Sequence, residues 1–131
     1  MKITKNFTLT ELTKTSTGIE NKPNRQQVAA LITLCGKVLQ PARDLYGKPI
    51  NVTSGFRSVA VNTAVGGVRN SQHLLGEAVD ITTYSRASNK QLFEIIRDNL
   101  NFDQLINERD FSWIHVSYKS LGENRKQVLI L

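Results

Sequence analysis

The sequence has almost no cysteine, the residue whose disulfides stabilise many small secreted proteins, and it has no long apolar run. One cysteine, Cys35, is present among 131 residues, which excludes an internal disulfide. No run of apolar residues approaches the roughly 20 that a membrane-spanning helix needs, and Met1–Lys5 lacks the apolar stretch of a signal peptide. We therefore expect a chain that is cytoplasmic at synthesis and has no membrane span. Cys35 lies among apolar residues, which favours a small buried hydrophobe over a redox thiol.

Repeats, low-complexity segments and linkers are also absent, so residues 1–131 are expected to form a single domain, and we expect a monomer. The composition, 40% hydrophobic and 21% charged, is sufficient for a buried core. The net charge of +6 favours anionic partners, among them nucleic acid and an anionic cell wall. Because the lysines and arginines are scattered, we interpret them mainly as solvated surface and expect no specific nucleic-acid binding.

The pattern of apolar residues predicts helices that alternate with strands. Apolar residues recur every three or four positions from Val28 to Leu45, which predicts a long helix that Pro41 should kink or break and Gly47 should end. Two capping-box spacings, Thr8 to Glu11 and Ser88 to Gln91, predict further helix starts. A short helix is expected over residues 58–64. Strands are predicted over residues 49–54, 78–82, 104–107 and 113–118, and residues 128–131 are either an edge strand or an apolar tail. This order of elements predicts an α+β domain.

The chain has two histidines, one near an acidic residue and the other in a strand-like segment. His73 precedes Asp80 by seven residues, with Gly76 between them, and Asp80 is flanked by Val79 and Ile81. His115 lies in a segment that alternates between apolar and polar residues. Two imidazoles and one carboxylate are the ligand set of an open catalytic zinc site, which keeps a fourth position for water. A loop with His73, returned by Gly76 into a strand with Asp80, would bring two of these ligands together.

Taken alone, these residues also fit a simpler interpretation. A histidine in a loop is commonly a surface residue, and an aspartate in an apolar strand can simply accept backbone hydrogen bonds.

Several short segments, in this order, resemble the zinc D-alanyl-D-alanine carboxypeptidase family and its LAS-type relatives, which cut peptide bonds in the bacterial cell wall. The resemblance extends from about Phe7 to Tyr118. It rests on Ser-x-His at Ser71, Ala-x-Asp at Ala78, Trp-x-His at Trp113, and on the segments Ser54–Ser58, Asn62, Val65–Gly67 and Asp103–Ile106. It implies a zinc ion held by His73, Asp80 and His115. It also implies the small antiparallel sheet packed by helices of the DD-peptidase and Hedgehog-type fold, with zinc on the open face.

The general base departs from the pattern of the family. Related enzymes often carry an acidic residue three positions before the last histidine, where this chain has Ser112, and serine cannot accept the proton. Glu108 and Asp110 are the alternatives. We favour Glu108 because residues 104, 106 and 108 share one face of a predicted strand next to that of His115. The sequence around Glu108 also resembles the phage endolysin-like branch of the family.

Two further residues are candidates for substrate binding. The guanidinium of Arg57 suits a carboxylate or a developing oxyanion, and the resemblance places it beside the metal. An exposed arginine at a strand end is the alternative. Ser71 either binds substrate or orients the loop that leads to His73.

These observations predict a zinc metallopeptidase that acts on peptidoglycan stem peptides, as a carboxypeptidase or an endolysin-type endopeptidase. The protein would reach the bacterial cell wall after release or delivery. Two alternatives belong to other classes: a zinc-binding cell-wall or structural module without turnover, which Ser112 keeps open, and a basic nucleic-acid-binding domain.

Overall fold

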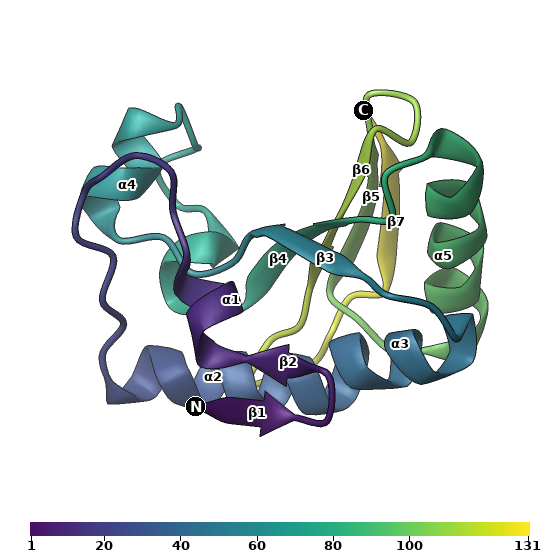
Figure 1. Ribbon diagram of the computed structural model, residues 1–131, viewed down its shortest axis with the longest axis horizontal. Coiled ribbons are helices and arrows are strands. Elements are labelled where there is room, and N and C mark those ends of the chain that lie inside the picture. Colours follow the sequence, from purple (N-terminus) through teal and green to yellow (C-terminus); the bar gives the residue numbers. More distant parts are fainter.

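A computed structural model describes residues 1–131 and contains two sheets and five α-helices (Figure 1). The first sheet is a short antiparallel pair, β1 (Lys2–Thr4) with β2 (Phe7–Thr8), which the sequence analysis did not predict. The second sheet has five strands in the order β3-β4-β6-β5-β7. Its strands are β3 (Asn51–Ser54), β4 (Ala78–Thr82), β5 (Gln104–Glu108), β6 (Trp113–Ser117) and β7 (Gln127–Ile130). The architecture is α+β, as the pattern of elements predicted.

The main sheet is antiparallel except at one edge. Strands β3, β4, β6 and β5 pair antiparallel, whereas β7 pairs parallel with β5. Of the two alternatives for the last residues, the edge strand is therefore the observed one. None of the helices is both long and apolar enough to cross a membrane.

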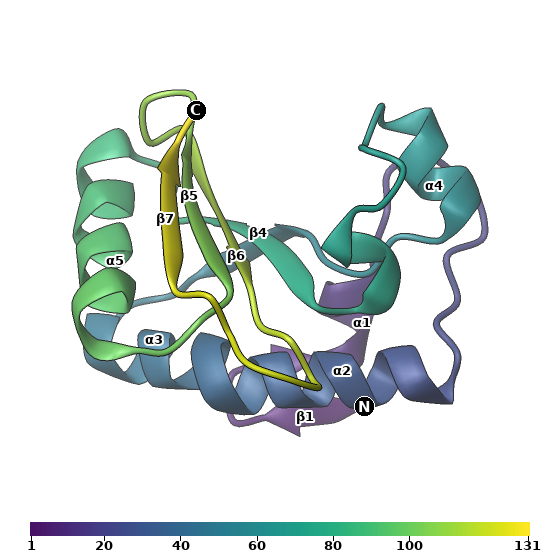
Figure 2. The same ribbon diagram turned by 180° about the vertical axis from the view of Figure 1, so that it is seen from behind.

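The helices lie around this sheet (Figures 1 and 2). They are α1 (Leu9–Thr13), α2 (Arg25–Leu34), α3 (Gln40–Tyr46), α4 (Val59–Ala64) and α5 (Arg86–Asn99). The predicted capping box at Thr8 is present: the hydroxyl accepts from the backbone of Glu11, and the Glu11 carboxylate accepts from the backbone of Thr8. The short helix over residues 58–64 is confirmed with Ser58 as its N-cap.

One helix prediction needs correction, and the predicted interruption at Pro41 takes a specific form. The helix expected to start at Ser88 begins three residues earlier, because the Ser85 hydroxyl accepts from the Ser88 backbone at 3.1 Å and Ser85 is the N-cap. The chain stays helical past Pro41, but the regular α-helix is interrupted just before this residue. A π-helical turn over Cys35–Leu39, closed by a hydrogen bond from the backbone N–H of Gln40 to the backbone oxygen of Cys35, leads directly into α3, and Pro41 is the second residue of α3. Gly47 ends the helix in the left-handed conformation, as predicted.

The core lies between the inner face of the main sheet and the helices. Alternation along β4 and β6 turns apolar side chains into this core, among them Val79, Ile81, Ile114 and Val116. Cys35 is one of its buried residues, and burial raises the pKa of its thiol to about 12, with the charge of Glu11 adding to the effect. The prediction of a small buried hydrophobe is confirmed. The residues between these apolar positions, Asp80 and His115, point to the other face of the sheet.

Candidate metal centre

Neighbouring strands bring Asp80 and His115 together. These two residues are direct partners across the antiparallel pair of β4 and β6, so their side chains emerge on the same face of the sheet. One oxygen of Asp80, Oδ1, lies 3.1 Å from Nδ1 of His115. The sequence could place each residue on a strand, but only the register of the two strands makes them neighbours.

The loop before β4 brings in His73. A 3₁₀ turn over Gln72–Leu75 carries this residue, and Gly76 ends the turn in the left-handed conformation, at a φ of 73°, before the chain enters β4. A side chain at position 76 would also collide with the backbone oxygen of Gln27, because an added Cβ would lie 2.5 Å from it. The predicted role of Gly76 as the returning residue is confirmed.

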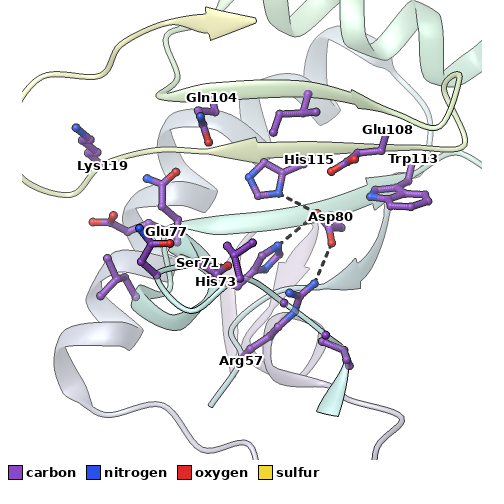
Figure 3. Close-up of a pocket in the computed structure, with 18 of the residues that line it drawn as sticks. Arg57, Ser71, His73, Glu77, Asp80, Gln104, Glu108, Trp113, His115 and Lys119 are labelled. Atoms are coloured by element: carbon purple, nitrogen blue, oxygen red, sulfur yellow. Dashed lines mark hydrogen bonds and ion pairs between the residues drawn. The ribbon is translucent and has the colours of Figure 1, made fainter. Parts of the chain in front are cut away.

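The simpler interpretations of these residues do not fit the structure. His73 is 3% exposed, so it is not a surface histidine. Its Nε2 lies 3.4 Å from Oδ1 of Asp80, and its Nδ1 lies 2.7 Å from the backbone oxygen of Gly55. Asp80 is bonded through side chains: Oδ1 faces the two histidines, and Oδ2 accepts from Arg57 at 3.3 Å. Figure 3 shows the three-residue group and this arginine.

The geometry suits a metal ion. The candidate ligand atoms of His73, Asp80 and His115 all lie within 4.8 Å of one another. The carbonyl of Gly55 can only accept, so it selects the tautomer of His73 that carries its proton on Nδ1, and Nε2 stays free to bind a cation. Burial alone would raise the pKa of Asp80, but the hydrogen bonds and charges of His115 and His73 outweigh it and lower that pKa, so the carboxylate is ionised.

The His73–Asp80–His115 group lines a groove with a volume of about 720 Å³. Arg57, Ser71 and Glu108 line this groove as well, as the sequence analysis expected. In Figure 3 the carboxylate of Glu108 points toward His115. Glu108 itself pairs with Trp113 across β5 and β6. Asp110, the alternative to Glu108, lies outside the groove lining, and its side chain is 87% exposed beside Arg86. Of the two carboxylates, therefore, only Glu108 faces the groove.

Arg57 is held in place rather than exposed at a strand end. Its side chain is 15% exposed, and besides Asp80 it donates to Ser54 and Asn62. Ser71 orients the loop, because its hydroxyl accepts from the backbone N–H of His73 at 3.1 Å. It also lines the groove, so the structure leaves room for its second expected role, a contact with substrate.

The sequence analysis did not assign a site role to several residues of the groove. Beyond His115 the wall is formed by Gln104, Glu77 and Lys119. Arg125 also lines this end and is bound to the buried carboxylate of Asp103 through Nη2 at 2.7 Å. The position of Gln104 two residues before Ile106 on one strand face could have indicated its place, whereas Lys119 and Arg125 lie in irregular segments with no such signal.

Comparison with known proteins agrees with this geometry. A zinc D-Ala-D-Ala carboxypeptidase from Streptomyces albus G is 40% identical over 80 residues, which are 58% of this chain and 31% of that enzyme. The chain thus spans less than a third of the length of this curated relative. The profile of the family described as Peptidase M15 matches residues 5–117, which is most of the chain. The chain therefore belongs to the peptidase M15 family.

Proposed function

We propose that this protein is a zinc metallopeptidase that hydrolyses peptide bonds in peptidoglycan stem peptides. The observation that carries the proposal is the convergence of His73, Asp80 and His115 in the wall of one groove, with their ligand atoms within 4.8 Å. Membership of the M15 family and the likeness to an enzyme named for D-Ala-D-Ala cleavage support the reaction class and the substrate.

The residues fit zinc as the resident metal. Imidazole nitrogens and a carboxylate oxygen are common zinc ligands in proteins, and three protein ligands leave a position open for catalysis. When bound, zinc supplies a Lewis acid that polarises the scissile carbonyl and makes water a better nucleophile at neutral pH. His73 would bind through Nε2 and His115 through Nδ1, because these nitrogens face Oδ1 of Asp80.

Glu108 is the proposed general base. Its carboxylate lies on the strand next to that of His115 and faces the groove, so it can accept the proton of the attacking water and deliver it to the leaving amine. Ser112, at the position where relatives often carry an acid, donates to the backbone oxygen of Arg109 at the turn, and a serine cannot accept the proton. A glutamate on the adjacent strand thus replaces the acid that Ser112 lacks.

Arg57 and Ser71 are the proposed substrate-binding residues. The guanidinium of Arg57 has five N–H donors, and its contacts with Ser54, Asn62 and Asp80 use three of them. The remaining donors can bind a substrate carboxylate or the developing oxyanion. The hydroxyl of Ser71, which also lines the groove, can contribute one further hydrogen bond.

The shape of the groove accommodates an extended peptide. Trp113 and Glu108 lie on one side of the His–Asp–His group, and Gln104, Glu77 and Lys119 lie on the other (Figure 3). Substrate residues can therefore lie on both sides of the scissile bond, which suits the endolysin-type endopeptidase of the two proposed reactions. The protein would meet this substrate in the bacterial cell wall after release or delivery.

The test is digestion of purified peptidoglycan with and without a chelator, followed by mass analysis of the fragments. We expect stem-peptide fragments that disappear with chelator and return when zinc is added. Loss of a single terminal D-Ala would identify the carboxypeptidase, and internal cleavage would identify the endopeptidase. If zinc binds at one ion per chain but no fragment forms, the protein is a zinc-binding module without turnover. DNA binding with steep salt dependence and no metal requirement would support the nucleic-acid alternative instead.

A further inference from the structure

The guanidinium of Arg57 is fixed by three different elements. Its Nε donates to Oγ of Ser54 at 2.9 Å, its Nη1 to Oδ1 of Asn62 at 3.3 Å, and its Nη2 to Oδ2 of Asp80 at 3.3 Å. Ser54 and Asp80 are direct partners across β3 and β4, so the sheet supplies two of these acceptors. The third acceptor, Asn62, comes from α4.

Asn62 is a buried acceptor that, like Ser54 and unlike Asp80, lies outside the lining of the groove. It is 4% exposed, and each of its polar groups has a partner. Its Nδ2 donates to the backbone oxygen of Val68 at 2.9 Å, and its backbone oxygen accepts from the N–H of Gly67 at 2.9 Å. The bond to Val68 sets the orientation of the amide, which turns Oδ1 toward Arg57. A buried polar side chain with this many partners is held rigidly.

The contact between Asn62 and Arg57 also needs an unoccupied space that only glycine leaves. A Cβ at Gly67 would lie 2.0 Å from Oδ1 of Asn62 and 3.0 Å from Nη1 of Arg57. The amide oxygen and the guanidinium therefore meet over the backbone of Gly67. These three residues form one packed junction at the groove wall, to which Arg57 and Gly67 belong.

We propose that Asn62 is a positioning residue that fixes the Arg57 guanidinium for substrate and acts on the reaction only through Arg57. An arginine side chain has many rotamers, and a donor aimed in advance at the substrate does not have to be ordered during the reaction. The kinetic part of this inference rests on the proposed peptidase function. The positioning itself can be measured without any turnover.

The kinetic experiment compares Asn62→Ala, Asn62→Asp and the control Thr63→Ala with the wild-type protein on stem peptides. Thr63 lies next to Asn62 on α4 and is exposed, and its hydroxyl donates to the backbone oxygen of Val59. Asn62→Ala should lower kcat/KM about tenfold, the rate equivalent of one hydrogen bond. Asn62→Asp keeps the acceptor for Arg57 but loses the donor to Val68, and it should stay within about threefold of the wild type. Thr63→Ala should leave the rate unchanged.

Two results would overturn the proposal. One is an Asn62→Asp protein as impaired as Asn62→Ala, because the bond to Val68 would then be the important one. The other is an equal loss from Asn62→Ala in the wild-type and Arg57→Lys backgrounds, because a residue that acts through Arg57 should add less than twofold once the guanidinium is gone.

The structural experiment follows the Nη1–H signals of Arg57 by NMR in the folded protein, because Nη1 is the atom that donates to Asn62. We expect slow exchange with water in the wild type and in Asn62→Asp, and fast exchange in Asn62→Ala, at a melting temperature that shows all three are folded. Unchanged protection in Asn62→Ala would refute the positioning role. If the wild type cuts no wall peptide, the proposed function fails, whereas this measurement still decides the role of Asn62.

Discussion

Asp80 and His115 face each other across β4 and β6, with Oδ1 and Nδ1 3.1 Å apart. The same row of the sheet continues to Ser54 on one side and to Ile106 on the other. Because side chains alternate between the two faces of a strand, a shift of one residue in register would turn either ligand into the core. The metal centre therefore depends on the same strand pairing that forms the hydrophobic core.

This relationship predicts one zinc ion per chain. His73→Ala and His115→Ala should each lose stoichiometric zinc, since two ligands hold a metal ion much more weakly than three. Metal analysis of the purified variants is the measurement. Gln104→Ala, a change in the same groove at a residue outside the His73–Asp80–His115 group, is the control and should keep its zinc. Full zinc content in both histidine variants would exclude the site.

The placement of the two carboxylates predicts different effects on hydrolysis. Glu108→Gln keeps size and metal but removes the base, and it should slow hydrolysis by about 10² to 10⁴, the usual contribution of a positioned acid–base group. Asp110→Asn should change the rate less than twofold, because this side chain is exposed outside the groove. Rates on stem peptides at equal zinc content decide the matter. An inactive Asp110→Asn beside an active Glu108→Gln would reverse the assignment.

The three hydrogen bonds made by the planar guanidinium of Arg57 predict that lysine cannot replace this residue. Arg57→Lys keeps the positive charge but loses the fork that reaches Ser54, Asn62 and Asp80 at once. We expect kcat/KM to fall about 10- to 100-fold, equivalent to one or two lost hydrogen bonds to charged groups, while zinc stays bound. Unchanged turnover would show that Arg57 has no part in binding substrate or the oxyanion.

The geometry of the turn before β4 predicts that a single methyl group added at Gly76 lowers the stability of the fold strongly. Gly76→Ala should destabilise the fold by about 2 kcal/mol or more, because alanine at a positive φ is strained and its Cβ would collide with the backbone of Gln27. Gly47→Ala is a matched control: its φ of 78° is similar, but no atom lies within 4 Å of the added Cβ. Denaturant unfolding compares the two. Equal losses of unfolding free energy in the two variants would show that the close approach at Gly76 has no energetic cost.

The lowered pKa of the Asp103 carboxyl predicts that the protein loses stability in acid. The hydrogen bond from Arg125 is the largest of the effects that lower the pKa of this buried carboxyl to about 2. A carboxyl with a lowered pKa in the folded state stabilises the protein fully above its ordinary pKa near 4, and this stabilisation is lost as the pH falls from about 4 to about 2. Asp103→Asn should flatten the stability curve in that window. Asp98→Asn, at a surface pair with Arg97, should leave the curve nearly unchanged.

The sequence by itself determined the local structure and the kind of site. Thr8 and Glu11 are three residues apart, so their capping box needs no distant partner, and the alternation around Asp80 and His115 specifies strands with one polar face. Two histidines and an aspartate near a glycine turn indicated a metal centre. These features depend on neighbours a few residues away, which is the range over which backbone propensities act.

The tertiary structure decided which atoms meet. Ser85 rather than Ser88 caps α5, because both serines offer a similar local signal and the folded chain selects one of them. The parallel pairing of β7 with β5, the bond from His73 to Gly55, and the contact of Asp80 with Arg57 all join segments that are distant in the sequence. Such contacts depend on strand register and on the paths of loops. No local pattern of residues specifies either of these, since both result from the packing of the whole core.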